Sequence, residues 1–334
     1  MKKLKDGQKN LLKWAFVLII IGLIIYVFRD MAGPIAKQLM KTSPWIIVLI
    51  ILATLLYGVG ESTVTMLFAR QYNPSFTFRQ AFGMTYFVSF YRTATLGNGA
   101  GVSALVYLNH HGVKTSEAFG MYMIEYAIHK LSIGLMAVVL YLCYYRYMDE
   151  TFGQYSIYMT IGFAVTIVIT SCLMLFVCAG WFHRLLKKLM NLVNFKGRFT
   201  EKFDKIKEQC DIMEVASKQL LRKGKLLVSI ILLNFCKLSC WFIIPYIVLY
   251  KMGAFSPLLA LSITAVAVML AAVIPTPAGI GSSEFVMIAM FGAVIGGAEA
   301  GAMALLYRFA TFVFPCALGA VYAGRFALGK KKSV

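Results

Sequence analysis

The stretch AAVIPTPAGIGSSEF, residues 271–285, lies between apolar segments long enough to cross a membrane. Two prolines and two glycines occur within seven of its residues, 275–281. They interrupt any helix, because proline removes a backbone donor and glycine favours positive φ. A carboxylate, Glu284, follows three residues later. A broken backbone and a charge within apolar sequence predict a buried polar site, since lipid cannot satisfy either group.

The composition indicates that the chain is a membrane protein. Of 334 residues, 60% are hydrophobic and only 14% are charged, and the mean hydropathy is +0.75. A soluble domain of this size cannot bury so much apolar surface, so we predict an all-α integral membrane protein. A transmembrane helix needs roughly 20 apolar residues. Six segments approach this length: 11–28, 45–68, 119–144, 156–180, 225–250 and 299–326.

The basic residues predict the orientation. Of the 33 Lys and Arg residues, 21 lie in residues 1–13, in the loop 184–225 or in the tail from Arg325. Cytoplasmic loops are enriched in these residues, so we expect both termini and this loop on the cytoplasmic side of a cell membrane. The sequence has no basic domain with interleaved aromatic residues, which argues against nucleic-acid binding. Helical spacing of apolar residues over 199–220 predicts an amphipathic helix on the inner membrane surface or, alternatively, on a partner protein.

Two further apolar regions, 80–108 and 257–297, are interrupted near their middle by TATLGNGAG (93–101) and PTPAGIG (275–281). The pieces on either side are short for a membrane of roughly 30 Å core thickness. The predicted orientation requires region 80–108 to begin and end on the cytoplasmic side of the membrane. Region 257–297 must begin and end on the outer side. Each is therefore a re-entrant helical hairpin or a complete pair of spans.

The chain then reads as two repeats of inverted topology, an architecture typical of alternating-access transporters with a site at the repeat interface. The stretch GAGVS at 99–103 mirrors GIGSS at 279–283. We expect the broken-helix apices to be buried together; they comprise Gly97, Gly99, Gly101, Pro275, Pro277, Gly279 and Gly281. We predict one polytopic membrane domain, 1–334, consisting of a lead-in (1–44), a first repeat (45–144), a linking span with the basic loop (145–224) and a second repeat with the basic tail (225–334).

Ionisable residues also lie well inside the apolar segments, and each costs roughly 3 kcal/mol at a helix centre unless it has a partner or a polar cavity. We expect Arg308 to pair with Glu284, and Arg92 with Glu125. The set serves either as structural ion pairs or as a substrate site. The candidate substrate-binding residues are Glu61, Arg92, Glu125, His129, Lys237, Glu284 and Arg308, and Lys130 is also buried in its segment.

The sequence does not indicate an enzyme. It contains no Ser-His-Asp arrangement, no HExxH zinc motif and no GxxxxGK[ST] phosphate loop. Its four histidines and seven cysteines do not have the spacing of metal ligands. We therefore expect no catalytic residues, no cofactor and no metal.

The segments IPTPAGIGSSE (274–284) and LLYRFATFVFPCALG (305–319) resemble the flippase-like family named for the transmembrane region of lysylphosphatidylglycerol synthase, also called multiple peptide resistance factor. The family pattern is approximately P-x-P-G-G-x-G-x-x-E, followed by a span with Tyr-Arg. Ala278 replaces one glycine of this pattern, and the usual Gly-Gly-Asp and Arg of the first broken region are absent. Glu125 matches a later acidic position, whereas Tyr126 and His129 stand where Arg and Asp are common. The matching residues are Pro275, Pro277, Gly279, Gly281, Glu284, Tyr307 and Arg308.

The resemblance implies a lipid flippase that moves a modified phospholipid, such as lysylphosphatidylglycerol, to the outer leaflet, where its charge repels antimicrobial peptides. The substrate phosphate is then expected near Arg308, Lys237 and the half-helix N–H groups, with Glu284 or Glu125 neutralising a basic headgroup. The synthase's soluble acyltransferase domain is expected to be absent, so phosphatidylglycerol lysyltransferase activity is not expected.

Other functions remain open from the sequence. The chain could transport a glycolipid, a polyprenyl-linked sugar, a small solute or an ion, or it could be a non-transporting partner of a separate lipid-modifying synthase. Expected partners are the membrane phospholipid, such a synthase and a second copy of the chain in a homo-oligomer.

Overall fold

The computed structural model of the protein describes residues 33–193 and 223–329, and also residues 204, 206–208, 211–212 and 214–215. All elements among these residues are helical, and this part of the chain contains no strand. The predicted span 11–28 lies outside the described residues. So does most of the predicted amphipathic helix 199–220, although the positions described within it are helical. The all-α prediction is confirmed for the part of the chain that is described.

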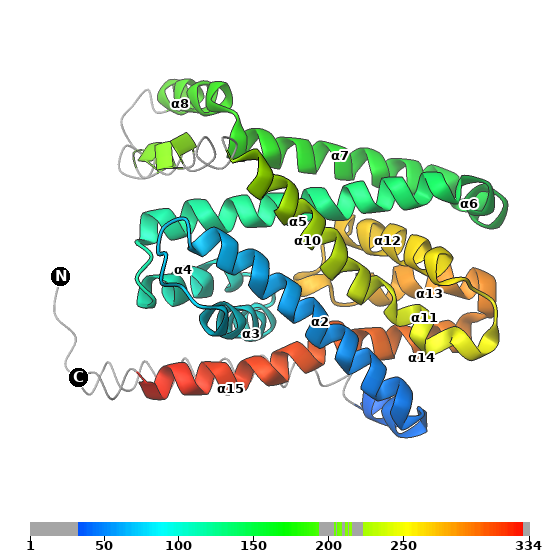
Figure 1. The fold of residues 1–334 in the computed structure, drawn as a ribbon. Coiled ribbons are helices and arrows are strands. Elements are labelled where there is room, and N and C mark those ends of the chain that lie inside the picture. Colours follow the sequence, from blue (N-terminus) through cyan, green and yellow to red (C-terminus); the bar gives the residue numbers. More distant parts are fainter. Residues whose placement is uncertain are drawn as a thin grey trace.

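Five helical segments are long and apolar enough to cross a membrane, and they run between the two ends of the molecule in Figure 1. They agree in position with five of the predicted spans. They are Pro44–Ala69, Thr115–Cys143, Tyr145–Cys178, Gly224–Met252 and Gly297–Leu328. The elements that form them are α2 (Pro44–Ala69), α5 (Thr115–Cys143), α6 (Tyr145–Phe152), η1 (Gly153–Tyr155), α7 (Ser156–Cys178), α10 (Gly224–Phe242), α11 (Ile244–Leu249), η2 (Tyr250–Met252), α14 (Gly297–Arg308), η4 (Phe309–Val313) and α15 (Phe314–Gly329).

The first broken hairpin consists of α3 (Phe78–Ala94) and α4 (Ala100–His110). With 11 residues, α4 is about 17 Å long, too short to cross a membrane core of roughly 30 Å. The two ends of the hairpin meet, because the side-chain amide of Asn73 donates a hydrogen bond to the carbonyl of His111 at 2.8 Å. The second arm of the region 80–108 is therefore shorter than a membrane span.

The second broken hairpin consists of α12 (Pro257–Val273), the short turn η3 (Pro277–Gly279) and α13 (Ser282–Ile295). Its helices have 17 and 14 residues, or about 26 and 21 Å. Their far ends also meet, since the rings of Phe255 and Phe291 contact each other edge to face at 5.5 Å between centroids. This hairpin enters the bundle from the end opposite to α3 and α4 (Figure 1).

Two large apolar clusters form the core, one toward each end of the molecule. Along α2, Ala53 belongs to one cluster and Val64 to the other. Along α10 and α11, Ile244 and Ile230 divide in the same way. The charged residues Glu61 and Lys237 lie on these helices between the two clusters. A third, smaller cluster that includes Tyr57 and Leu238 packs beside them, so the charges are enclosed by apolar side chains.

An amphipathic helix that the sequence analysis did not identify, α8 (Gly180–Val193), follows α7. Its sequence repeats Trp181, Leu185, Leu189 and Val193 at every fourth position, and basic residues lie between them. A helix with an apolar and a basic stripe is typical of the membrane interface. It lies at one end of the bundle in Figure 1.

A glycine sets the close packing of α15 on α3. A Cβ atom at Gly319 would overlap the carbonyl oxygen of Tyr86 and lie 2.8 Å from the Cβ atom of Phe90. We expect Gly319→Ala to lower the free energy of unfolding by about 2 kcal/mol, since overpacking forces such helices apart. Thermal unfolding in detergent measures this change. Gly324→Ala on the same helix, where a Cβ meets nothing within 4 Å, is the control; an equal loss in both variants would contradict the explanation.

Candidate functional site

The two helix breaks meet inside the bundle. A Cβ atom on Gly97, between α3 and α4, would lie 3.7 Å from the backbone nitrogen of Ala278 and 3.9 Å from its Cα atom. The loops of the two broken hairpins are therefore in van der Waals contact. Gly97, Gly279 and Gly281 have φ values of 100°, 70° and 83°, which glycine adopts without strain.

Each break also contains one residue that is not glycine but has a left-handed backbone. These residues are Leu96, with φ 53°, and Ala278, with φ 54°. This conformation costs an L-residue roughly 1–2 kcal/mol, which explains why glycine is usual at the position of Ala278. The surrounding structure must hold the strained tip. Arg308 contributes, because its Nη2 donates to the carbonyl of Ala278 at 3.4 Å.

The Arg308 site, which consists of Arg308, Glu284, Ala278 and Phe312, lies at the second break. The Nε atom of Arg308 is 3.1 Å from Oε1 of Glu284, and the guanidinium lies 4.1 Å from the ring centroid of Phe312. The other carboxylate oxygen of Glu284 accepts a hydrogen bond from the Gly281 N–H at 3.0 Å, at the start of α13. The predicted pairing of Arg308 with Glu284 is confirmed. The pair joins α14 to the tip of the second hairpin.

A π-helical turn, η4, follows Arg308 directly. Pro315 has no N–H group, so the carbonyl of Thr311 lacks its usual helical donor. A wider turn accommodates such a defect, and π turns within α-helices often occur at functional sites. The helical register therefore changes directly after Arg308, the residue that donates a hydrogen bond to Ala278 in the second break.

The Lys237 site lies between α2, α5 and α10. The ammonium of Lys237 donates to a carboxylate oxygen of Glu61. Lys237 approaches α2 closely because residue 60 is glycine; a Cβ there would lie 2.6 Å from the Cβ atom of Lys237. Stacked rings of Tyr57 and Trp241, 3.5 Å apart, lie one turn along both helices. The Lys237–Glu61 ion pair was not predicted. The sequence shows that each residue is charged but does not show the register of α2 against α10.

Glu125 also belongs to the Lys237 site, and its predicted pairing with Arg92 is wrong. The carboxyl group of Glu125 is buried, and its Oε1 accepts a hydrogen bond from the hydroxyl of Thr65 at 2.5 Å. Its charged neighbours are Glu61 and Lys237. The side chain faces α2 and α10, because the rotation of α5 is set by its apolar packing, which the sequence alone does not specify.

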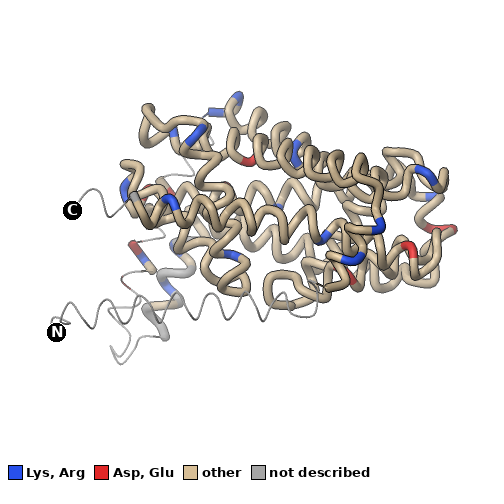
Figure 2. Tube along the Cα trace, turned by 90° about the horizontal axis from the view of Figure 1, so that it is seen from below, with Lys and Arg blue, Asp and Glu red and all other residues tan. Residues whose placement is uncertain are grey.

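His129 and Lys130 follow Glu125 on α5. His129 lies beside Asn234 and interacts electrostatically with Glu61 and Lys237. The ammonium of Lys130 lies 5.6 Å from the ring centroid of Tyr126. Figure 2 shows Lys, Arg, Asp and Glu positions inside the bundle as well as at its ends. In the described part of the chain, no group of three His, Cys, Asp or Glu residues could hold a metal ion.

Arg92 lies between the two sites, on the last turn of α3. Its carbonyl accepts a hydrogen bond from the Gly97 N–H at 2.7 Å, so it is tied to the first break. Its charge interacts with Glu61 in the Lys237 site and with Arg308 in the other. Within the described residues, its guanidinium forms no hydrogen bond or ion pair. Among the described residues, the guanidinium of Arg92 is therefore available to bind a ligand, whereas Arg308 and Lys237 are each paired with a glutamate.

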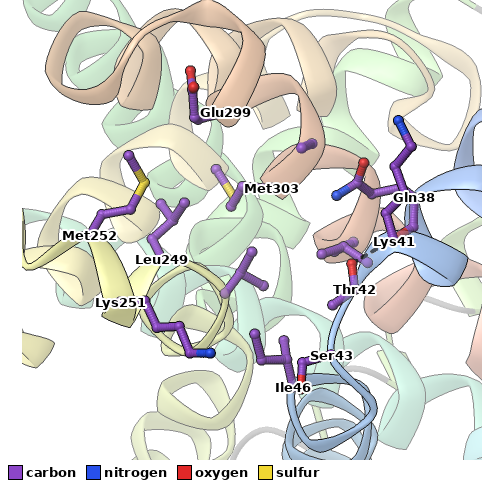
Figure 3. Close-up of a pocket in the computed structure, with 13 residues that line it drawn as sticks. Gln38, Lys41, Thr42, Ser43, Ile46, Leu249, Lys251, Met252, Glu299 and Met303 are labelled. Atoms are coloured by element: carbon purple, nitrogen blue, oxygen red, sulfur yellow. Dashed lines mark hydrogen bonds between the residues drawn. The ribbon is translucent and has the colours of Figure 1, made fainter.

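A pocket of about 370 Å³ opens at the end of the bundle where the second hairpin enters. Its walls come from residues 38–46, which include the start of α2, from residues 248–252 of α11 and η2, and from residues 299–306 of α14. Lys41, Lys251 and Glu299 lie around it, with apolar side chains such as Leu249 between them (Figure 3). Sequence reasoning missed this pocket because its walls come from three segments that are distant along the chain.

One family comparison covers nearly all of these features. The chain matches the family described as "Lysylphosphatidylglycerol synthase TM region" over residues 13–319. No match was found among curated proteins. The matched residues include both broken hairpins, both ion pairs and Arg92. The chain therefore belongs to the family of lysylphosphatidylglycerol synthase transmembrane regions.

Proposed function

We propose that the protein moves a modified phospholipid, lysylphosphatidylglycerol or one of similar charge, from the inner to the outer leaflet of a bacterial cell membrane. The contact between the two helix breaks, flanked by buried charges, is the observation that carries this proposal. A charged headgroup at the membrane centre costs several kcal/mol unless polar groups surround it. Broken helices and paired charges supply such surroundings where the rest of the bundle is apolar.

The arrangement of the hairpins supports alternating access between inverted repeats. One hairpin enters from each end of the bundle, and their tips meet at Gly97 and Ala278. In transporters of this kind, one repeat rocks against the other around a fixed central site. The loop 184–225, rich in Lys and Arg, would mark its end as cytoplasmic, with both chain termini on the same side.

The charges suggest how a headgroup with a phosphate and an amine would bind. Arg308 and Lys237 are each paired with a glutamate, so they are poor candidates for the phosphate. Arg92 is unpaired among the described residues, and arginine binds phosphate through two parallel hydrogen bonds. We therefore assign the phosphate to Arg92. The amine would approach the carboxylates of Glu61 and Glu125.

The proposal is tested by a leaflet-resolved assay in proteoliposomes. Lysylphosphatidylglycerol, phosphatidylglycerol and a neutral glycolipid are compared, with protein-free liposomes as the reference. We expect lysylphosphatidylglycerol to move fastest, because it alone carries both the phosphate and the amine. No movement of any lipid would overturn the proposal, and movement of the glycolipid alone would favour a sugar-lipid transporter.

A cross-link between the tips tests whether they must separate. A Cβ atom at residue 97 would lie 3.9 Å from the Cα atom of Ala278, so a disulfide between the two positions needs only a small backbone shift. Cysteine at residue 97 also carries the strain of its φ of 100°. We expect the double variant Gly97→Cys/Ala278→Cys to lose lipid movement on oxidation and to regain it on reduction. Each single variant under the same oxidant is the control. Full movement in the cross-linked protein would show that transport does not require opening at this contact.

A further inference from the structure

Buried polar atoms without partners gather around the Lys237–Glu61 pair. Within the described residues, six buried side-chain nitrogen or oxygen atoms have no hydrogen-bond partner. Four of the six belong to α5 and α10, the two helices that carry Glu125 and Lys237. These atoms are Oε2 of Glu125, Nδ1 of His129, Oδ1 of Asn234 and Nε1 of Trp241. Two of the four, Nδ1 of His129 and Oδ1 of Asn234, belong to side chains that lie beside each other. Buried polar atoms are normally satisfied, so Oε2 of Glu125 is left as an unsatisfied carboxyl oxygen beside the Lys237–Glu61 pair.

Glu125 has no counter-ion of its own if its carboxyl group is ionised. Lys237 is in contact with Glu61, and Glu125 is the second carboxylate beside the same ammonium. Helices α7 and α12 contain no Asp, Glu, Lys, Arg or His residue, and α4 contains only His110, at its last position. The charged or titratable groups contributed by the other helices around Glu125 are Tyr57 and Glu61 (α2), Arg92 (α3), Tyr122 and His129 (α5) and Lys237 (α10).

A buried carboxylate without its own counter-ion must be neutralised, because the cost of an isolated charge in apolar surroundings is prohibitive. In the observed arrangement, the ammonium of Lys237 neutralises Glu61. Only Oε1 of Glu125 has a partner, the neutral hydroxyl of Thr65. We propose that Glu125 binds a proton here, and that this proton leaves when the cationic part of a lipid headgroup enters the Lys237 site.

The exchange conserves charge. Within the Lys237 site, the carboxylates of Glu61 and Glu125 and the ammonium of Lys237 sum to one negative charge, which either a proton on Glu125 or a headgroup ammonium neutralises. Arg92 acts on Glu61 from outside this site, and its charge is left for the phosphate. When the headgroup enters, the O–H bond of Glu125 breaks, and its proton passes to water at the open end of the transporter. Repeated in opposite directions, this exchange couples outward lipid movement to inward proton movement. The coupling rests on the proposed function, whereas proton binding by Glu125 does not.

Infrared difference spectroscopy tests proton binding without any lipid substrate. Spectra of the full chain in phosphatidylcholine vesicles are recorded over a pH titration, and the band of a protonated buried carboxyl group is followed. We expect a band that is lost in Glu125→Gln and retained in Glu117→Gln, a matched change two turns earlier on α5. Glutamine preserves the shape of the protonated side chain and its contact with Thr65. An identical band in the wild type and Glu125→Gln, or no such band, would overturn the proposal.

Adding short-chain lysylphosphatidylglycerol or sodium chloride then tests the exchange. We expect the Glu125 band to disappear with the lipid but not with sodium. Disappearance with sodium alone, or persistence with bound lipid, would overturn the exchange. In proteoliposomes, Glu125→Gln is expected to abolish the dependence of lipid movement on a pH gradient. If the band titrates but no lipid moves in the wild type, the proposed function fails while the proton site stands.

Discussion

Replacing Arg92 by alanine is expected to reduce lysylphosphatidylglycerol movement in proteoliposomes roughly a hundredfold while leaving the thermal stability of the protein nearly unchanged. The two expectations differ because the guanidinium has no hydrogen bond or ion pair with another described residue. Its removal breaks no structural contact of that kind. A lost hydrogen-bonded contact with a charged phosphate, by contrast, is worth about 3 kcal/mol, or a factor of roughly 100.

Two companion variants sharpen this result. Arg92→Lys keeps the charge but loses the two-pronged geometry, so we expect intermediate movement. Arg79→Ala removes an exposed arginine from the first turn of the same helix and is expected to leave movement unchanged. A large loss of stability in Arg92→Ala, or normal lipid movement, would contradict the assignment of the phosphate. A phosphate at Arg308 would then be the better explanation.

The transmembrane spans and both helix breaks could be predicted because they depend on local composition. Twenty apolar residues indicate a span wherever they pack, and the Pro and Gly residues of 275–281 break a helix in any surroundings. The pairing of Arg308 with Glu284 was predictable for a related reason. Both residues lie in the second predicted repeat, near one break, and each requires a partner in the membrane.

The remaining contacts depend on helix rotation and register, which local composition does not encode. Glu61 and Lys237 are 176 positions apart, and they meet because Gly60 lets α10 approach α2. Glu125 faces Thr65 and not Arg92 because of the rotation of α5. The sequence does contain a signal for each contact: Gly60 precedes Glu61, and the hydroxyl of Thr65 follows one turn later. These signals can be interpreted only once the helices are placed against each other.

Replacing Lys237 by methionine is expected to give the largest loss of stability. Lys237 is 2% exposed, and its removal leaves the carboxylate of Glu61 without its partner. Breaking a buried pair on one side typically costs about 3–5 kcal/mol, more than removing both charges together. Because the side chain of Glu61 is 26% exposed, water offsets part of this cost and we expect about 2–3 kcal/mol. We therefore expect a marked fall in the unfolding temperature in detergent for Lys237→Met. Lys225→Met, at the exposed start of the same helix, should have little effect.

The double variant Glu61→Gln/Lys237→Met separates stability from transport. The double variant should recover most of the stability lost in Lys237→Met, because neither charge of the pair remains without its partner. Its loss of stability should be smaller than the sum of the two single losses by about 2 kcal/mol. Lipid movement should not recover, since Glu61, one of the two carboxylates that receive a headgroup amine, has been removed. Additive losses of stability would mean that the two side chains do not depend on each other. Recovered movement together with recovered stability would reduce the Lys237–Glu61 pair to a structural link between α2 and α10, and the amine would then have to bind elsewhere.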